Sequence, residues 1–178
     1  WIPGAGKSFQ YRQSISVRLL ENPCAKFLLL ATNIVYAKNL ARDLELAFQG
    51  LVCSYSDKDR ELTKFQLNVV SFQSIFKASD IPYTDALLDE IRSIASLVCT
   101  TTANSPDYLY ALRSILKGVQ RITCCDGDLL LTISDSEPRP LVESFTNYLF
   151  PGRNVVCATS SGPTPAHLER SICVHFTY

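Results

Sequence analysis

The sequence of 178 residues contains no methionine, a single tryptophan and no long apolar segment. Its longest apolar runs, such as Phe27–Ala31, are far too short to cross a bilayer, so we expect no transmembrane helix and no membrane partner. No secretory signal peptide is recognisable at its start. Because methionine is missing, the chain lacks a natural start, and we expect it to be a fragment or an excised domain.

An excess of charge of either sign is also lacking, because 17 basic residues balance 17 acidic ones. No general basic field therefore indicates a nucleic-acid partner, and any such contact requires a local patch. The charged loop 56–64 mixes both signs and is typical of a solvated surface. Arg113, Lys117 and Arg121 recur near helical spacing and are the better candidate patch, with a plain solvated helix face as the favoured alternative.

The cysteines show no pattern of a metal site or a disulfide framework. The seven of them are odd in number, and none belongs to a Cys-x-x-Cys pair. This usage predicts reduced cysteines in an intracellular protein. His167, Cys173 and His175 lack the spacing of a zinc site, so we expect no zinc there.

Apolar runs alternate with helical patterns along the chain, which predicts β-α units, a mostly parallel central sheet and a three-layer α/β fold. We expect strands at 26–32, 51–55, 67–71, 86–89, 121–125 and 154–158, and helices at 9–21, 35–48, 91–101, 108–116 and 142–149. Residues 1–160 are assigned to one domain. Because 162–165 is rich in proline and glycine, we assign 161–178 to a linker or C-terminal extension.

The first motif is Gly4-Ala5-Gly6-Lys7-Ser8, which has the pattern of the second half of a phosphate-binding loop. Glycines let backbone N–H groups turn toward a polyphosphate, the lysine would reach the β- and γ-phosphates of ATP, and the serine hydroxyl would bind Mg²⁺. Trp1 stands where the full motif has a glycine, and the strand that should lead into the loop is missing.

The second motif is Asp89-Glu90, which closes an apolar strand. In a phosphate-loop ATPase the Asp holds the Mg²⁺ ion and the adjacent Glu polarises the attacking water, at the carboxyl end of a strand beside the loop. The alternative is an exposed acidic pair at the start of a helix, where the helix dipole favours negative charge. Because both motifs occur in one α/β chain, we favour the catalytic interpretation.

The order of the segments resembles that of superfamily-two DNA helicases, most of all the herpesvirus-type replication origin-binding proteins. The resemblance covers most of the chain and rests on the segments 4–8, 29–32, 69–75, 87–91 and 122–126. It implies a P-loop (RecA-like) domain whose first strand is missing or truncated. It also implies that the protein is located in the nucleus. It also implies an ATP hydrolase that moves along DNA in replication when joined to a second helicase domain.

The resemblance implies a role for each matching residue. Lys7 and Glu90 would be catalytic, and Ser8 and Asp89 would hold Mg²⁺. The loop Gly4, Ala5, Gly6, Lys7 and Ser8 would bind ATP, the side chains of Thr32, Asn33, Ser71, Gln73 and Ser74 would contact the DNA backbone, and Asp126 would couple hydrolysis to strand movement. Ordinary strand-to-helix caps are the alternative for the segments around Thr32 and Ser71.

Two departures from the family pattern leave other functions open. In the family pattern, the Asp of this segment is followed by a small residue and a threonine. Here Asp126 is followed by Gly127 and Asp128. Asp85 stands at a buried strand position, which costs free energy unless the carboxylate is paired. The alternatives are a degenerate, non-catalytic P-loop domain and another P-loop NTPase or kinase, although the Asn-Lys-x-Asp motif of GTPases and an Arg-rich lid are both lacking. We expect the isolated chain to bind ATP weakly.

Overall fold

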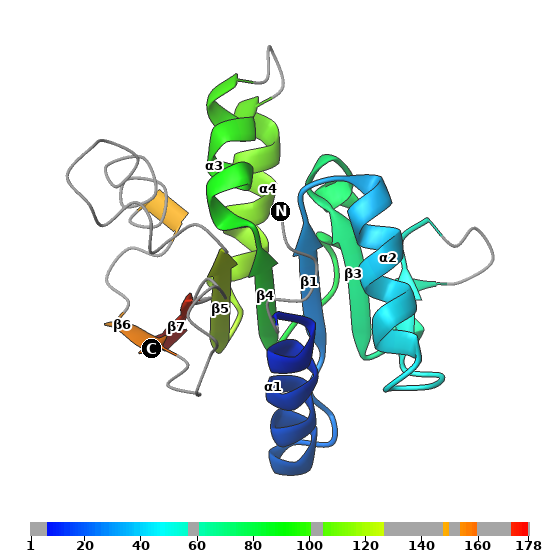
Figure 1. Ribbon diagram of the computed structural model, residues 1–178. Coiled ribbons are helices and arrows are strands. Elements are labelled where there is room, and N and C mark those ends of the chain that lie inside the picture. Colours follow the sequence, from blue (N-terminus) through cyan, green and yellow to red (C-terminus); the bar gives the residue numbers. More distant parts are fainter. Residues whose placement is uncertain are drawn as a thin grey trace, which may run out of the picture.

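The computed structural model describes residues 7–56, 61–100, 105–126, 148–149, 154–159 and 172–177. Its centre is a seven-stranded sheet of order β2-β3-β1-β4-β5-β7-β6 (Figure 1). The strands are β1 (Phe27–Ala31), β2 (Val52–Ser54), β3 (Leu67–Ser71), β4 (Asp85–Asp89), β5 (Arg121–Asp126), β6 (Asn154–Thr159) and β7 (Ile172–Thr177). The helices are α1 (Lys7–Glu21), α2 (Ile34–Glu45), α3 (Ile91–Thr100) and α4 (Ser105–Lys117), with 3-10 segments η1 (Leu62–Lys64) and η2 (Phe72–Ala78).

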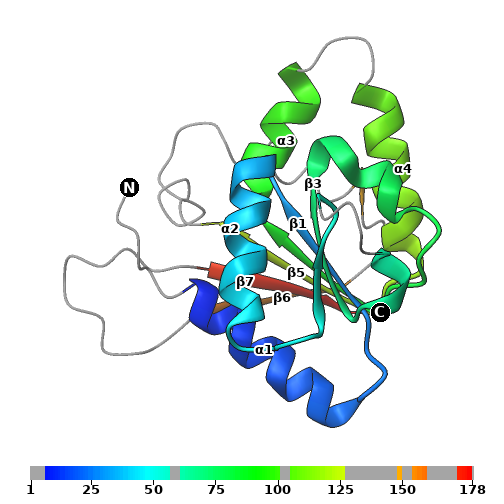
Figure 2. The same ribbon diagram turned by 90° about the vertical axis from the view of Figure 1, so that its right-hand side faces the viewer.

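Helices cover both faces of the sheet, so the domain has three layers (Figure 2). One apolar core lies between the sheet and α1 with α2, and a second lies between the sheet and η2, α3 and α4. Strand β1 shows why: Leu28 and Leu30 belong to the second core, whereas Phe27, Leu29 and Ala31 belong to the first. A continuous apolar run is expected for a parallel strand that is buried on both faces.

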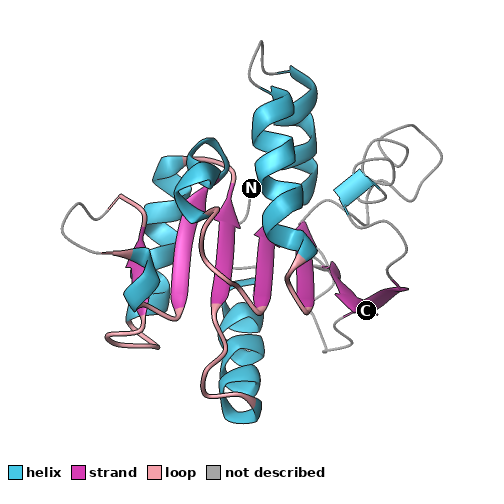
Figure 3. Cartoon of the chain, turned by 180° about the vertical axis from the view of Figure 1, so that it is seen from behind, coloured by secondary structure: helices cyan, strands magenta, loops and turns pink. Residues whose placement is uncertain are grey.

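The strands β2, β3, β1, β4 and β5 are parallel, and β7 pairs antiparallel with both β5 and β6. Figure 3 shows the strands in one row, seen from behind. The residues of β7 come from the segment 161–178, which the sequence assigned to a linker or extension. Their β-branched and aromatic residues favour a strand, and they pair over six positions with β5 and over six with β6.

The three-layer α/β fold with a mostly parallel sheet is confirmed. The finer assignment to the P-loop class is not, because residues 1–6 lie outside the described residues and five parallel strands between helices are common to many α/β domains. The predicted helices and strands up to residue 126 are present with shifted ends. Most of the helix predicted at 142–149 lies outside the described residues.

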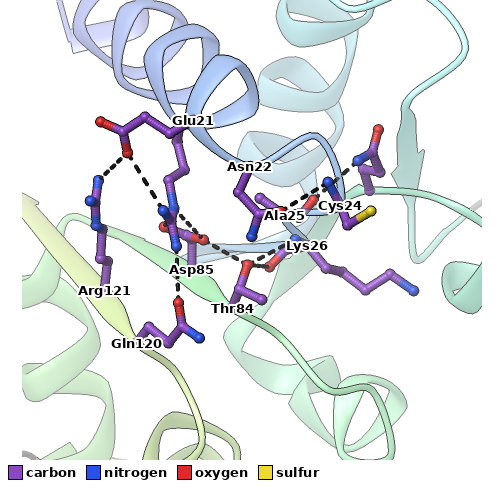
Figure 4. Close-up of polar contacts among 11 residues, drawn as sticks. Glu21, Asn22, Cys24, Ala25, Lys26, Thr84, Asp85, Gln120 and Arg121 are labelled. Carbon is purple, nitrogen blue, oxygen red and sulfur yellow. Dashed lines mark hydrogen bonds and ion pairs between the residues drawn. The ribbon is translucent and has the colours of Figure 1, made fainter.

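A polar network fastens α1 to the amino ends of β4 and β5 (Figure 4). The Nε atom of Arg18 donates to both oxygens of Asp85, at 3.0 and 3.2 Å. The hydroxyl of Thr84 donates to the second of these oxygens at 2.6 Å. Both charged side chains are largely buried, with 12% of the arginine and 7% of the aspartate exposed. The partner that the sequence required for Asp85 is therefore Arg18.

Candidate functional site

The carboxyl ends of the neighbouring strands β1 and β4 lie at the point where the connections of the chain turn to opposite sides of the sheet. From β1 the chain passes through α2 to β2 and β3 on one side, and β4 lies on the other side of β1. In open α/β sheets, ligands bind in the crevice outside the carboxyl ends of the strands at such a switch point. The residues that follow β1 and end β4 are therefore the candidate functional site.

Asp89 is the central group of this site. It ends β4 and is 1% exposed. Its Oδ2 atom accepts a short hydrogen bond from the hydroxyl of Tyr36, and its Oδ1 atom accepts one from the backbone N–H of Glu90 at 3.0 Å. The carboxylate is thus held by a side chain of α2 and by the chain that leaves its own strand, which fixes its position at the strand end.

Tyr36 is placed by the start of α2. Asn33 caps this helix, since its side-chain oxygen accepts a hydrogen bond from the backbone N–H of Tyr36 at 2.9 Å. The first turn of α2 thereby directs Tyr36 across the ends of β1 and β4 to Asp89. For Asn33, the helix cap that the sequence left open as an alternative is present in the structure.

The Tyr36 hydroxyl is half-buried and lies under the influence of nearby carboxylates. Burial raises its pKa above the usual value, and the charge of Asp89 together with the hydrogen bond to it adds to the rise. The charges of Glu90 and Asp43 act in the same direction. The raised pKa keeps Tyr36 protonated as the donor to Asp89.

Glu90 has an uncommon backbone conformation. Its φ angle is +55°, in the left-handed region, and its carbonyl accepts the N–H of Ile94 at the start of α3. A side chain other than glycine in this region costs about 1 kcal/mol or more, and such residues cluster at functional sites. The turn between β4 and α3 therefore carries strain beside the buried carboxylate.

The other predicted contact residues lie along the same end of the sheet in different settings. Ser71 is buried at the end of β3, and its hydroxyl donates to that of Tyr55 at 3.2 Å. Gln73 is exposed, whereas Thr32 and Ser74 are half-buried. The DNA contacts proposed for these residues and for Asn33 stay a prediction.

The remaining predicted residues are not brought into this site by what the structure describes. Gly4, Ala5 and Gly6 lie outside the described residues, and Lys7 and Ser8 are described only as backbone of α1. The side chain of Asp126, at the end of β5, is also outside the described part. Among the described residues, no group of three or more His, Cys, Asp or Glu side chains could hold a metal ion.

The sequence did not identify Tyr36 as a residue of the site. The signal that could have found it is its spacing from Asn33: a cap residue three positions earlier fixes the first turn of a helix. Which strand end that turn faces depends on the order of strands in the sheet, and the separation of 53 positions between Tyr36 and Asp89 conceals the contact.

Comparison with known proteins gives matches in fold alone. No protein-family model and no curated protein matches the sequence. The methyltransferase domain of bacterial Hen1 is 13% identical, with 95% of this chain and 98% of that chain covered and a TM-score of 0.49. The N-methyltransferase NodS from Bradyrhizobium japonicum WM9 is 12% identical, with 96% of each chain covered and a TM-score of 0.44. The Pnkp1/Rnl/Hen1 RNA repair complex contains a chain that is 12% identical, with 98% of this chain and 36% of that chain covered and a TM-score of 0.40.

The first two of these structures are methyltransferases. The helicase interpretation is wrong. With it fall the assignment of ATP and Mg²⁺ as cofactors and ATP hydrolysis as the activity. That Gly4–Ser8, Asp89, Glu90 and Asp126 are functional residues stays a prediction. The physical reason is that parallel α/β sheets place polar residues at the carboxyl ends of strands for many ligands, so the order of short motifs does not identify the ligand.

The sequence made separate predictions about a membrane, a second helicase domain and DNA as partners. Within the described residues, no helix combines the length and apolar character needed to cross a membrane. The second helicase domain loses its basis together with the helicase interpretation. Contact with DNA and the nuclear location stay predictions.

Proposed function

We propose that this domain binds a small nucleoside with a positive charge, of the S-adenosylmethionine class, at the carboxyl ends of β1 and β4, and that it serves methyl transfer. The observation that carries the proposal is the buried carboxylate of Asp89 at the end of β4, beside the switch point of the sheet. Its Oδ2 atom is held by Tyr36, and its position at a strand end suits a ligand group.

The position of the site supports a nucleoside ligand. In related doubly wound sheets, an acidic side chain near a strand end accepts hydrogen bonds from the hydroxyl groups of a ribose. Asp89 and Glu90 occupy the end of β4, and Thr32 and Asn33 follow the neighbouring end of β1. Carboxylate, hydroxyl and amide groups therefore lie at the strand ends beside which a ribose would bind.

The charge of the site supports a ligand with a cation. Three carboxylates, those of Asp89, Glu90 and Asp43, act on the hydroxyl of Tyr36 in the same direction. A sulfonium or ammonium group is stabilised by such surroundings, whereas added negative charge is not. S-adenosylmethionine combines a ribose diol with a sulfonium, and its methyl group can pass to a nucleophile while the sulfur becomes a neutral thioether.

Titration calorimetry with S-adenosylmethionine tests the proposal on the full chain, with Asp89→Asn as the decisive variant. We expect the wild type to bind, and the variant to bind at least about tenfold more weakly because it removes a charge and a strong acceptor. Asp80→Asn is the matched control, since Asp80 is an exposed aspartate that precedes the amino end of β4, opposite to the end that carries Asp89, and it should bind as the wild type does.

Two results would overturn the proposal. One is a folded wild type that does not bind S-adenosylmethionine. The other is binding that Asp89→Asn leaves unchanged, which would place the nucleoside elsewhere. ATP with Mg²⁺ serves as the comparison ligand, and binding of ATP without binding of the sulfonium nucleoside would also count against it.

A further inference from the structure

The outward face of α4 carries aromatic and cationic side chains side by side. Its inward face, with Ala111, Leu112, Ile115 and Leu116, is buried in the core against η2 and the sheet. The outward positions are taken by Tyr110, Arg113 and Lys117, three and four residues apart. All three are exposed, and Tyr110 is 73% exposed.

A second aromatic ring lies beside this face. The guanidinium carbon of Arg113 is 4.6 Å from the centre of the ring of Tyr148, which is itself 43% exposed. Leu149, the next residue, is buried in the core below, so Tyr148 is anchored next to α4. We call Tyr110, Arg113, Lys117 and Tyr148 the α4 surface.

Charge sets this surface apart from the chain as a whole. The net charge of the protein is zero, so no general field draws a polyanion to it. On α4, Arg113 and Lys117 are cationic, and Asp107 is the acidic residue near the other end of the helix. Arg121, the third residue of the patch considered in the sequence, starts β5 and forms an ion pair with Glu21 at 3.1 Å. On α4 itself, the two cations lie in its last two turns.

We propose that the α4 surface binds single-stranded nucleic acid. Exposed aromatic rings offer stacking faces to bases, and neighbouring cations meet the phosphates, which is the combination that proteins use for single strands. A guanidinium already stacked on a tyrosine is also held in place for a phosphate or a base. The surface lies on the outer side of α4, and it is independent of the nucleoside site proposed at the carboxyl ends of β1 and β4.

The test measures binding of fluorescent 12-nucleotide oligo(dT) and oligo(U) to the full chain by anisotropy at two salt concentrations. We expect Tyr110→Ala to weaken binding about tenfold, because stacking of one base contributes about 1–3 kcal/mol. Arg113→Gln should weaken binding at low salt and reduce the dependence of affinity on salt concentration. Similar losses for both oligonucleotides would indicate that the surface does not select the sugar.

Matched controls separate this surface from general charge and hydrophobicity. Arg42→Gln removes an exposed arginine from α2, and Phe9→Ala removes an exposed ring from α1; neither should change the affinity by more than about twofold. A wild type that binds neither oligonucleotide would overturn the proposal. So would losses in the controls equal to those in the α4 variants, or a poly-glutamate chain that binds as tightly as the oligonucleotides, which would indicate an acidic protein partner.

Discussion

Strand β4 carries a buried aspartate at each end, and the two are held in different ways. Asp85, at the amino end, receives the guanidinium of Arg18 and the hydroxyl of Thr84. Asp89, at the carboxyl end, receives the hydroxyl of Tyr36 and the backbone N–H of Glu90. The first carboxylate has an opposite charge beside it at 3.0 Å, and the second accepts the hydroxyl of a tyrosine whose pKa the charges of Glu90 and Asp43 also raise.

The difference separates a structural acid from a candidate ligand-binding one. The Arg18–Asp85 pair joins α1 to the sheet, and its geometry uses both oxygens of the carboxylate. The Tyr36–Asp89 pair joins α2 to the sheet at the switch point, next to a strained turn. Identical residues four positions apart in one strand are thus expected to respond differently to mutation.

The largest expected effect is on stability, at the amino end. Asp85→Ala leaves the buried guanidinium of Arg18 without its carboxylate, and we expect the free energy of unfolding to fall by about 3 kcal/mol. Urea denaturation monitored by circular dichroism measures this loss. The double variant Arg18→Met, Asp85→Leu should recover most of it, because an apolar pair of similar volume needs no compensation for buried charge.

A loss below about 1 kcal/mol for Asp85→Ala would show that the pair contributes no more than a surface salt bridge. The Arg18–Asp85 pair would then not be the structural contact that distinguishes the amino end of β4 from its carboxyl end.

A smaller effect is expected at the carboxyl end, from Tyr36→Phe. Removal of the hydroxyl takes one charge-assisted hydrogen bond from Asp89, and the free energy of unfolding should fall by about 1.5 kcal/mol. The same denaturation measurement applies. An unchanged stability would mean that the Tyr36 hydroxyl is equally well hydrogen-bonded in the unfolded chain.

The pH dependence of this contribution sharpens the comparison. The pKa of Tyr36 is raised in the folded protein by burial and by Asp89, so the folded chain keeps this proton at pH values where the unfolded chain, with a tyrosine pKa of about 10, loses it. The contribution is complete below pH about 10 and declines as the pH rises above it. The wild type should therefore lose stability more steeply above this pH than Tyr36→Phe does.

The smallest effect concerns the turn after Asp89. Because φ of Glu90 is +55°, a β-branched side chain should be less stable there than asparagine, by about 1 kcal/mol. Glu90→Val and Glu90→Asn both remove the carboxylate, so the difference in their melting temperatures reports the backbone alone. Equal values would contradict strain at this position.

Much of the fold could be predicted because it depends on local patterns. Apolar runs gave the parallel strands, and the need of Asp85 for a partner followed from its place within such a run. The partner itself could not be predicted, because Arg18 is 67 residues away and is brought close only when α1 packs on the sheet. Strand β7 was missed since its order comes from pairing with β5.

The site was predicted less well than the fold. Asp89 and Glu90 were recognised as a polar pair at a strand end, and the structure places them there. The ligand assigned to them came from the order of short motifs, which the topology of any parallel sheet reproduces. The carboxylates that act on Tyr36 come from two segments far apart in the sequence, α2 and the end of β4, so no local pattern reveals them.

The pairing of β7 with β5 has a consequence for solubility. The N–H and C=O groups along Arg121–Asp126 are covered by residues 172–177, which join the sheet only after a long stretch of intervening chain. A chain shortened before residue 172 would present β5 as an open edge to other molecules, and such edges pair with one another and aggregate. During synthesis this edge of β5 stays unpaired until residues 172–177 have been made. The order in which the strands are made therefore delays the protection of β5.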